Sequence, residues 1–150
     1  IAPFYDNDRV IGLAEMMNSF GVNQADPAIL DKINATLEHQ RIIDGHAPLL
    51  SGQELNGYVA AGIRSDHECS NAQEAKEKFA RGQWIMVREG TAAHNLEALL
   101  PLFEAPYAQR IMLVTDDKHP CDLLRDGHID AIVRKAVQCG SHYSHQSGNL

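Results

Sequence analysis

This sequence of 150 residues lacks the features that mark several large classes of protein. It has no uninterrupted apolar run of about eighteen residues, which a membrane-spanning helix needs, and no basic region followed by an apolar core, which marks a secretory signal. Lysine and arginine form no cluster, and the formal net charge is −7. Because nucleic-acid-binding proteins present a basic patch to the phosphate backbone, we expect no nucleic acid as a partner. The lack of a long apolar run means that we expect no membrane as a partner either.

Cysteine is also scarce. Cys69, Cys121 and Cys139 are odd in number and widely spaced, and they form no CxxC pair. This pattern argues against a disulfide framework and against a structural zinc knuckle. Reduced thiols fit it best, so we expect a cytoplasmic protein. The content of 44% apolar and 22% charged residues is ordinary for a folded domain, which excludes a disordered or collagen-like chain.

Short β-type runs alternate with longer helical stretches, which is typical of βαβ units and a parallel sheet. We expect five strands, which end at Glu15, Asp44, Asp66, Arg88 and Thr115. Helices are expected over residues 26–39, from 51, over 70–82, 91–100 and 120–124, and after 130. The predicted fold is α/β, a partial TIM-type (β/α)8 barrel, because a closed barrel has eight strands in roughly 250 residues.

Capping signals and helical periodicity predict several details. Ser51 and Glu54 fit a capping box, and Thr91 could cap the helix that Pro101 ends. In the helix over residues 70–82, three side chains are expected to face inward, namely Ala72, Ala75 and Phe79, and four outward, namely Glu74, Lys76, Glu77 and Lys78. The last helix should bury a stripe of Ile132, Val133, Ala136 and Val137. Residues 1–138 are predicted to form the barrel fragment and residues 139–150, which lose all periodicity, an irregular tail.

Four apolar runs each end on a residue that can bind a metal or exchange a proton. They cover residues 11–15, 42–46, 61–68 and 111–116. In a (β/α)8 barrel the C-terminal ends of all strands open onto one face, so these residues should meet there. Imidazole and carboxylate ligands suit Zn, Mn or Fe, and a metal-bound water is readily converted to hydroxide for hydrolysis. The predicted ligands are Glu15, His46, His67 and Asp116.

The neighbours of these residues leave some choices open. Glu68 follows His67 directly, so it can serve the same site as a proton shuttle only if the strand has ended and the turn rotates Glu68 inward. Asp116 is favoured over Asp117 because it directly follows the strand, although either could cap the next helix. Glu15 could also be a solvated carboxylate on a helix. Arg88 and Glu89 could be no more than a surface ion pair.

Five motifs carry a resemblance to a known family. They are Gly12-Leu13-Ala14-Glu15-Met16-Met17, Asp44-Gly45-His46-Ala47-Pro48, Ser65-Asp66-His67-Glu68, Met86-Val87-Arg88-Glu89-Gly90-Thr91 and Thr115-Asp116-Asp117-Lys118-His119-Pro120. Together they closely resemble the adenine deaminases of the amidohydrolase superfamily, in the order and approximate spacing of that family. The resemblance runs from about Asp8 to Val137.

The resemblance implies a metal-dependent barrel enzyme that hydrolyses adenine to hypoxanthine and ammonia in purine salvage or catabolism, with manganese or iron at a two-metal centre. By similarity, Glu15 would bridge the metals after strand four, and His46 and His67 would bind metal after strands five and six. Asp116, after strand eight, would bind metal and take a proton from the attacking water. Glu68 would protonate the purine ring. Arg88 and Glu89 would line the substrate site after strand seven.

The chain also departs from the family. The His-x-His pair that such enzymes place after their first strand does not occur in it, and strands one to three are missing. We therefore expect a fragment that binds metal weakly and has little or no activity alone, from a full-length protein that forms a homo-oligomer. Two alternatives remain. One is a catalytically dead remnant that acts as a binding or oligomerisation module, and the other is a different amidohydrolase deaminase or amidase.

Overall fold

The computed structural model describes the backbone of residues 1–147 and the side chains of residues 1–140. In this part of the chain the five predicted strands are present and their pairing is parallel, but they lie in two sheets rather than in the one sheet that was expected. β1 (Gly12–Met16) pairs with β2 (Ile42–Gly45) in one sheet. The other sheet has the order β3 (Ser65–Asp66), β4 (Trp84–Arg88) and β5 (Ile111–Val114). Each strand thus lies beside its neighbour in sequence, which is the arrangement that successive βαβ units produce.

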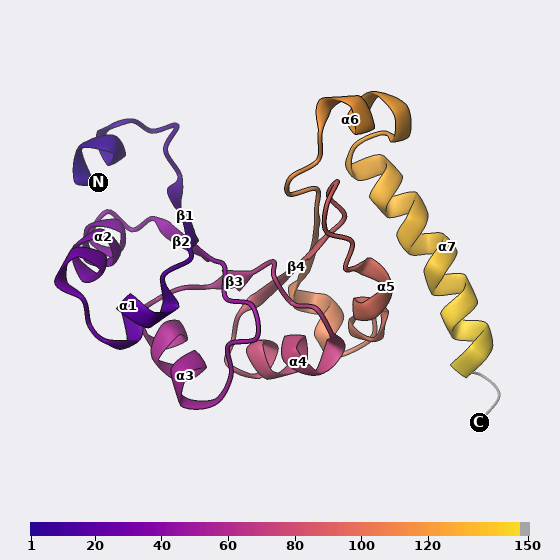
Figure 1. Cartoon of the computed structure of the whole chain (residues 1–150), viewed down its shortest axis with the longest axis horizontal. Helices are drawn as coiled ribbons and strands as arrows, with labels where there is room; N and C mark the ends of the chain where they lie inside the picture. Colours follow the sequence, from indigo (N-terminus) through magenta and orange to yellow (C-terminus); the bar gives the residue numbers. More distant parts are fainter. Residues whose placement is uncertain (148–150) are drawn as a thin grey trace.

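The helices lie outside the strands. Figure 1 shows the strands following one another along an open arc, with α2, α3, α4 and α7 on its outer side. The helical elements are η1 (Ala2–Asp6), α1 (Ser19–Asn23), α2 (Pro27–Glu38), α3 (Gly52–Ala60), α4 (Ala72–Ala80), α5 (Leu96–Leu99), η2 (Leu100–Leu102), η3 (Tyr107–Arg110), α6 (Pro120–Asp126) and α7 (Ile129–Ser147). The described residues do not close into a barrel. None of their helices has the length and apolar character that a membrane span requires.

Two apolar clusters form the core, one for each sheet. The first lies between the β1–β2 sheet and helices α1 to α3, and it comprises Met16, Val22, Ile33, Ile43, Ala47, Tyr58 and Ile63. The second lies between β4 and the helices α4 and α5, and it comprises Cys69, Ala75, Ile85, Val87, Leu96, Leu99 and Leu102. Backbone hydrogen bonds from Arg64 N to Ile43 O (3.0 Å) and from Trp84 N to Arg64 O (2.8 Å) continue the strand pairing between them. The two halves are therefore joined near β3.

The start of α2 agrees with its sequence signal. Asp26 is the N-cap, its carboxylate accepts a hydrogen bond from Ala28 N at 2.8 Å, and Pro27 takes the first helical position. A proline fits there because the first amides of a helix have no intrahelical acceptor, so the N–H that proline lacks is not missed. Helix α2 then ends at Glu38, one residue before the predicted end.

The prediction for α4 is wrong for two of its charged residues. Ala75 is buried as expected, but Glu74 is also buried, and Lys78 is fully buried at 0% exposure. Asp66 lies buried beneath this helix, and Lys78 Nζ donates to its Oδ2 at 2.9 Å. A buried carboxylate is stable only when it is paired and hydrogen-bonded, and this requirement overrides the usual exposure of lysine. Helical periodicity contains no information about such a partner.

Two predicted caps are also corrected. Ser51 takes the N-cap position of α3 but makes no side-chain cap bond, and Gly52 N donates instead to Glu77 of α4. Thr91 does not begin a helix, because α5 begins only at Leu96. Its hydroxyl accepts a hydrogen bond from His119 N at 2.8 Å and contacts the carboxylate of Asp122, so it ties the loop after β4 to the start of α6.

The last helix buries less than the predicted stripe. Ile132 is buried and Ala136 packs against the second core cluster, but Val133 and Val137 are 44% and 68% exposed. Among the side chains of α7 that the structure describes, Ile132 and Ala136 therefore lie on the packed side, whereas Val133 and Val137 are largely exposed. The backbone stays helical to Ser147, so the predicted irregular tail is helical over 139–147. Residues 148–150 of that tail lie outside the described residues, and the division at residue 138 stays a prediction.

A matched pair of leucines tests the position of the second core cluster. Leu99 is fully buried in α5, whereas Leu124 in α6 is 91% exposed. We expect Leu99→Ala to lower the free energy of unfolding by about 2–5 kcal/mol, because it leaves a cavity in the core. Leu124→Ala should change it by less than about 0.5 kcal/mol. Urea unfolding followed by circular dichroism measures both values, and equal losses would contradict the packing described above.

Candidate functional site

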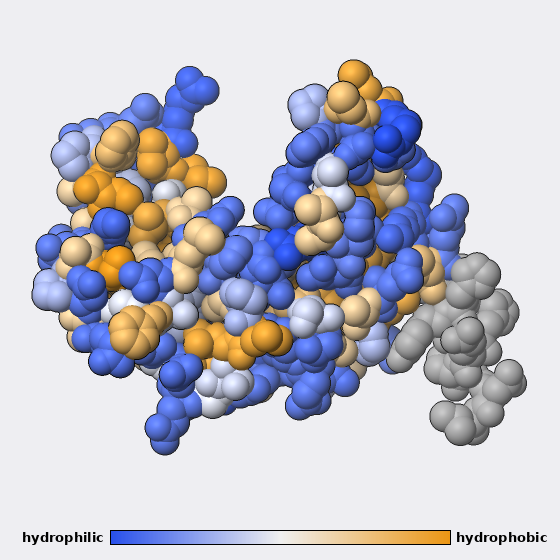
Figure 2. All heavy atoms as spheres, viewed as in Figure 1, coloured by the Kyte–Doolittle hydropathy of each residue, from blue (hydrophilic) through white to orange (hydrophobic). Residues whose placement is uncertain are grey.

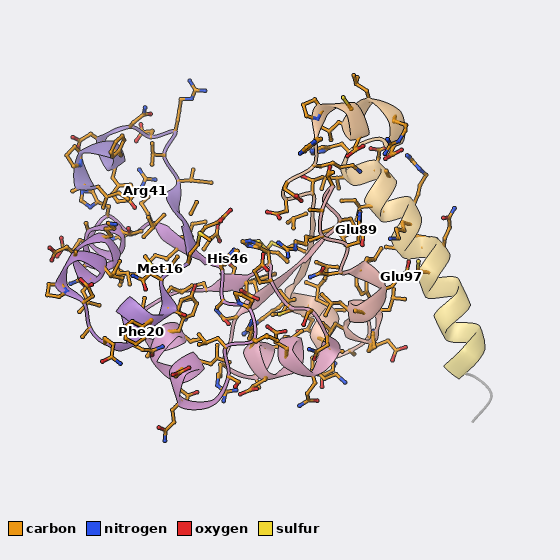
Figure 3. The ribbon with its side chains drawn as sticks, viewed as in Figure 1. Met16, Phe20, Arg41, His46, Glu89 and Glu97 are labelled. Atoms are coloured by element: carbon orange, nitrogen blue, oxygen red, sulfur yellow. The ribbon has the colours of Figure 1, made fainter. Side chains whose placement is uncertain are left out.

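Ionisable side chains gather where the strands end. Glu15 is the last residue but one of β1, His46 and His67 directly follow β2 and β3, Arg88 ends β4, and Asp116 lies two residues beyond β5. Figure 2 shows the molecule hollowed between two arms, and in Figure 3 the labelled His46 lies at the floor of this hollow. A cavity of about 190 Å³ opens there, and its lining residues are Ala14, Glu15, Asp44, His67, Met86, Val114 and Asp116.

Three predicted ligands converge on one point. His46 Nδ1 lies 3.2 Å from His67 Nε2, and Glu15 Oε2 lies 3.8 Å from the same His46 nitrogen. One ligand atom from each residue lies within 4.8 Å of the other two. Two ring nitrogens at 3.2 Å can share only one proton, so at least one of them presents a lone pair to the common centre. Such a group of imidazole and carboxylate donors fits a divalent transition metal.

Arg88 connects the predicted proton-transfer residues. Its Nη2 donates to Glu68 Oε2 at 2.9 Å, and its Nη1 donates to Glu68 Oε1 and, at 3.1 Å, to Asp116 Oδ2. Glu68 Oε1 lies 3.6 Å from the facing nitrogens of His46 and His67. Asp116 Oδ1 lies 4.0 Å from His67 Nε2. The guanidinium therefore holds Glu68 beside the histidine pair through a forked pair of hydrogen bonds, and it holds Asp116 there through a single one.

The turn after β3 brings Glu68 to the same side as His67. β3 ends at Asp66, and Asp66 Oδ2 accepts a hydrogen bond from Glu68 N at 3.1 Å. This side-chain bond closes a tight turn over His67, so the alternation of a regular strand no longer applies. The strand thus ends before Glu68 and the turn rotates its side chain inward, which is the condition under which Glu68 can serve the same site as His67.

The backbone is strained at Glu15 and Asp116. Both residues have positive φ, 47° and 50°, which is unfavourable for a residue with a side chain. At Glu15 the strain coincides with a β-bulge, because the pairing of β1 with β2 shifts between Leu13 and Met16. A bulge redirects side chains out of the regular alternation of a strand.

Tyr58 of α3 supports the site from below. Its buried hydroxyl donates to the carbonyl of Met16 and accepts a hydrogen bond from His46 N at 3.0 Å, so it links the ends of β1 and β2. Burial raises the pKa of Tyr58, which keeps the hydroxyl protonated and able to donate. Gly45 lies beside it, and a Cβ there would collide with the backbone oxygen of Ser65. Neither Tyr58 nor Gly45 was identified as a supporting residue from the sequence.

Glu89 does not lie with the other predicted residues. It is 6% exposed, and it accepts hydrogen bonds from Leu96 N (3.0 Å) and from Lys135 Nζ of α7 (2.7 Å). Figure 3 shows Glu89 in the arm that carries α7, away from His46. Successive residues of a strand point to opposite faces, and Glu89 directly follows Arg88 at the end of β4. Glu89 therefore anchors α7, and the surrounding cavity of about 340 Å³ is separate from the histidine pair.

The remaining histidines with described side chains lie outside the cluster. His94, His119 and His128 are all exposed. The buried partners beneath the site, Asp66, Glu74 and Lys78, were missed as a group. Asp66 belongs to the motif at residues 65–68. The sequence gives no signal that Lys78, one of several charged residues in its helix, is buried.

Comparison with known proteins shows that the chain is similar to one segment of several adenine deaminases. No family model matches the chain. It is 49% identical over 140 residues to an adenine deaminase of Desulfatibacillum aliphaticivorans, across 93% of this chain and 25% of that protein. It is 48% identical to adenine deaminase 1 of Rhizobium meliloti and 49% identical to an adenine deaminase of Oceanobacillus iheyensis, in each case across 24% of the relative. The chain thus spans about a quarter of the length of the curated relatives it matches.

Glu89 gives a prediction on stability and pH. Burial opposes its charge, but Lys135 and the amide of Leu96 outweigh burial and hold the pKa of Glu89 below its ordinary value of 4.5. Its contribution to stability is therefore complete above pH 4.5 and is lost as the pH falls through the lowered pKa. Lys135→Met should cost about 1–2 kcal/mol at pH 7 and reduce this dependence on acid.

Arg134→Met is the matched control. Arg134 forms an exposed ion pair with Asp130 on the same helix, so its loss should cost less than about 0.5 kcal/mol at pH 7. Urea unfolding at pH 7 and at pH 4 measures both variants. Equal effects of the two substitutions would show that the Glu89–Lys135 contact contributes no more than a surface ion pair.

Proposed function

Because this chain is homologous to one segment of the adenine deaminases, we propose that it supplies part of the active site of an enzyme that hydrolyses adenine to hypoxanthine and ammonia. The observation that carries the proposal is the convergence of Glu15, His46 and His67 within 4.8 Å at one end of parallel strands. The activity is that of the full-length enzyme, of which this chain is a segment.

The proposed fold of that enzyme is a TIM-type barrel, in which β1 to β5 are strands four to eight. Three features support this assignment. Neighbouring strands are parallel, their order in space follows the sequence, and the helices lie on the outer side of the arc. The ionisable residues lie at the C-terminal ends of the strands, which is where barrel enzymes carry their active sites.

We propose that Glu15, His46 and His67 hold one divalent cation, with Asp116 beside it. Manganese or iron fits these donors, and so does zinc. When bound, such an ion supplies Lewis acidity and lowers the pKa of a bound water toward neutrality. A two-metal centre, with Glu15 as the bridging carboxylate, would need ligands from the rest of the full-length enzyme, because this chain contains no His-x-His pair.

The other residues of the cluster have proposed roles in proton transfer. Asp116 Oδ2 is bonded to Arg88, so its Oδ1, on the side of His67, is available to accept a proton from the attacking water. Glu68 is a proton shuttle: its carboxylate takes up a proton from water and passes it to the purine ring, and Arg88 holds both carboxylates in place. Arg88 is also the proposed contact to substrate. The predicted contact of Glu89 with substrate gains no support from its position against α7.

A second candidate function is a binding or oligomerisation module. The observation that favours it is the inner face of the strands, where Ile42 and Trp84 are 53% and 42% exposed. A cavity of about 420 Å³ lies on this face, and its lining residues are Ile42, Asp44, Arg64, Ser65, Trp84, Met86 and Met112. Apolar surface of this kind is usually covered by another part of a protein. A homo-oligomeric full-length protein and a cytoplasmic location stay predictions.

Direct metal binding tests the proposed ligand set. The 150-residue chain should bind one Mn²⁺, and His67→Ala should weaken binding by at least about 100-fold, because it removes a ligand rather than a supporting group. His94→Ala is the control, since this exposed histidine lies outside the cluster. Titration followed by the electron paramagnetic resonance of free Mn²⁺ gives both affinities. Wild-type affinity in the His67→Ala chain would exclude this site.

A chimeric enzyme tests the proposed activity. The isolated chain with Mn²⁺ should release no ammonia from adenine, whereas the Desulfatibacillum enzyme should stay active when its matching 140 residues are replaced by those of this chain. In the chimera, Asp116→Asn should lower kcat by about 10²–10⁴, as expected for loss of a general base. Asp117→Asn is the comparison. A larger effect at Asp117 would reassign the role, and rapid turnover by the isolated chain would refute the fragment proposal.

A further inference from the structure

A single buried cation lies beneath the two histidines. Lys78 of α4 is fully enclosed, and each of the three N–H donors of its ammonium group can be matched to an acceptor on a neighbouring residue. It donates to Ala47 O at 2.6 Å, to Asp66 Oδ2 at 2.9 Å and to Glu74 Oε1 at 2.7 Å. Although burial opposes the charge, the neighbouring carboxylates raise the pKa of Lys78 above its ordinary value. The ammonium is therefore charged and fully satisfied at neutral pH.

The acceptors of Lys78 are immediate neighbours of the proposed metal ligands. Ala47 follows His46 in the chain, and Asp66 precedes His67. Asp66 Oδ1 also accepts a hydrogen bond from Ala47 N at 2.8 Å, so the two loops are joined by both a direct bond and the shared ammonium. These contacts bring together two segments that are about twenty residues apart in sequence. They leave neither loop free to move without breaking a buried ionic contact.

Other contacts extend this network to the rest of the site. Asp66 Oδ2, which Lys78 contacts, is the same atom that receives Glu68 N and closes the turn over His67. Glu74 Oε1 accepts from Leu49 N at 2.8 Å as well as from Lys78, which fixes the loop after His46 a second time. The network therefore determines the path of the backbone on both sides of the histidine pair.

The same region contains three residues that could themselves bind a metal, namely Asp66, Cys69 and Glu74. The ammonium of Lys78 already occupies the position between the two carboxylates. The thiol of Cys69 donates to Asp66 Oδ2, and burial raises its pKa, so it stays protonated. We assign no ion to this group, because an internal cation already takes its place.

We propose that Lys78 is a positioning residue for the metal site, and that its contacts with Ala47 and Asp66 set the distance between the ring nitrogens of His46 and His67. This inference rests on the proposed metal-binding function. It goes beyond that function because Lys78 contacts neither the ion nor the substrate. Supporting groups of this kind typically change metal affinity by about 10–100-fold.

Lys78→Met tests the proposal, because methionine approximates the volume of lysine and removes all three hydrogen bonds. We expect Mn²⁺ to bind about 10–100-fold more weakly, with all three ligands still present. The visible absorption of bound Co²⁺ should also change in intensity, because it reports the geometry of the ligands. Lys76→Met is the matched control on the same helix, since the ammonium of Lys76 lies over the ring of Tyr107. Its affinity and spectrum should equal those of the wild type.

Loss of Lys78 alone leaves two buried carboxylates without a cation, which can unfold the chain. The variant Asp66→Asn, Glu74→Gln, Lys78→Met keeps the volumes and removes all three charges, so it should fold, as circular dichroism would confirm. It too should bind Mn²⁺ at least tenfold more weakly. A folded triple variant with wild-type affinity would overturn the proposal for Lys78 alone. Failure of the wild-type chain to bind Mn²⁺ would overturn the proposed metal site and this inference together.

Discussion

The contact of one buried ammonium with two loops reinforces the strand pairing near β3 that joins the halves of this molecule. Each sheet has its own apolar cluster, and apolar packing alone does not determine how one half is oriented relative to the other. Lys78 comes from the second half, but it bonds to Ala47 of the first as well as to Asp66 at the boundary. Hydrogen bonds are directional, and a dry ionic contact tolerates little displacement. The relative position of His46 and His67 depends on this contact.

Local strain is the second requirement of the site. The left-handed backbone at Glu15 and Asp116 costs about 1–3 kcal/mol at each residue, which the surrounding structure must offset. At Glu15 the bulge in β1 and the bond from Tyr58 to Met16 hold the strand end in place. At Asp116 the guanidinium of Arg88 holds the side chain. Strain and support thus occur together at both ends of the ligand cluster.

Much of this could be predicted from the sequence, since apolar runs that end on ionisable residues indicate parallel strands with a common functional edge. The strands, the cap of α2 and the convergence of Glu15, His46 and His67 agree with that reading. Periodicity failed for Lys78 and Glu74, because Lys78 is paired with Asp66 of another segment and Glu74 is paired with Lys78 and the amide of Leu49. It also failed for Val133 and Val137, because a helix that packs along one edge leaves apolar residues outside. Such partnerships exist only once the tertiary structure has formed.

The division of the ligands between the two halves also links metal binding to folding. Glu15 and His46 belong to the half with the first cluster, whereas His67 begins the turn that leads into the second. An ion held by all three would bind only when both halves are folded and correctly docked. Such a ligand at 100 times its Kd stabilises the native state by about 2.7 kcal/mol. This stabilisation would act at the junction between the halves, because the ion contacts both. The two halves would therefore unfold as one cooperative unit rather than in succession.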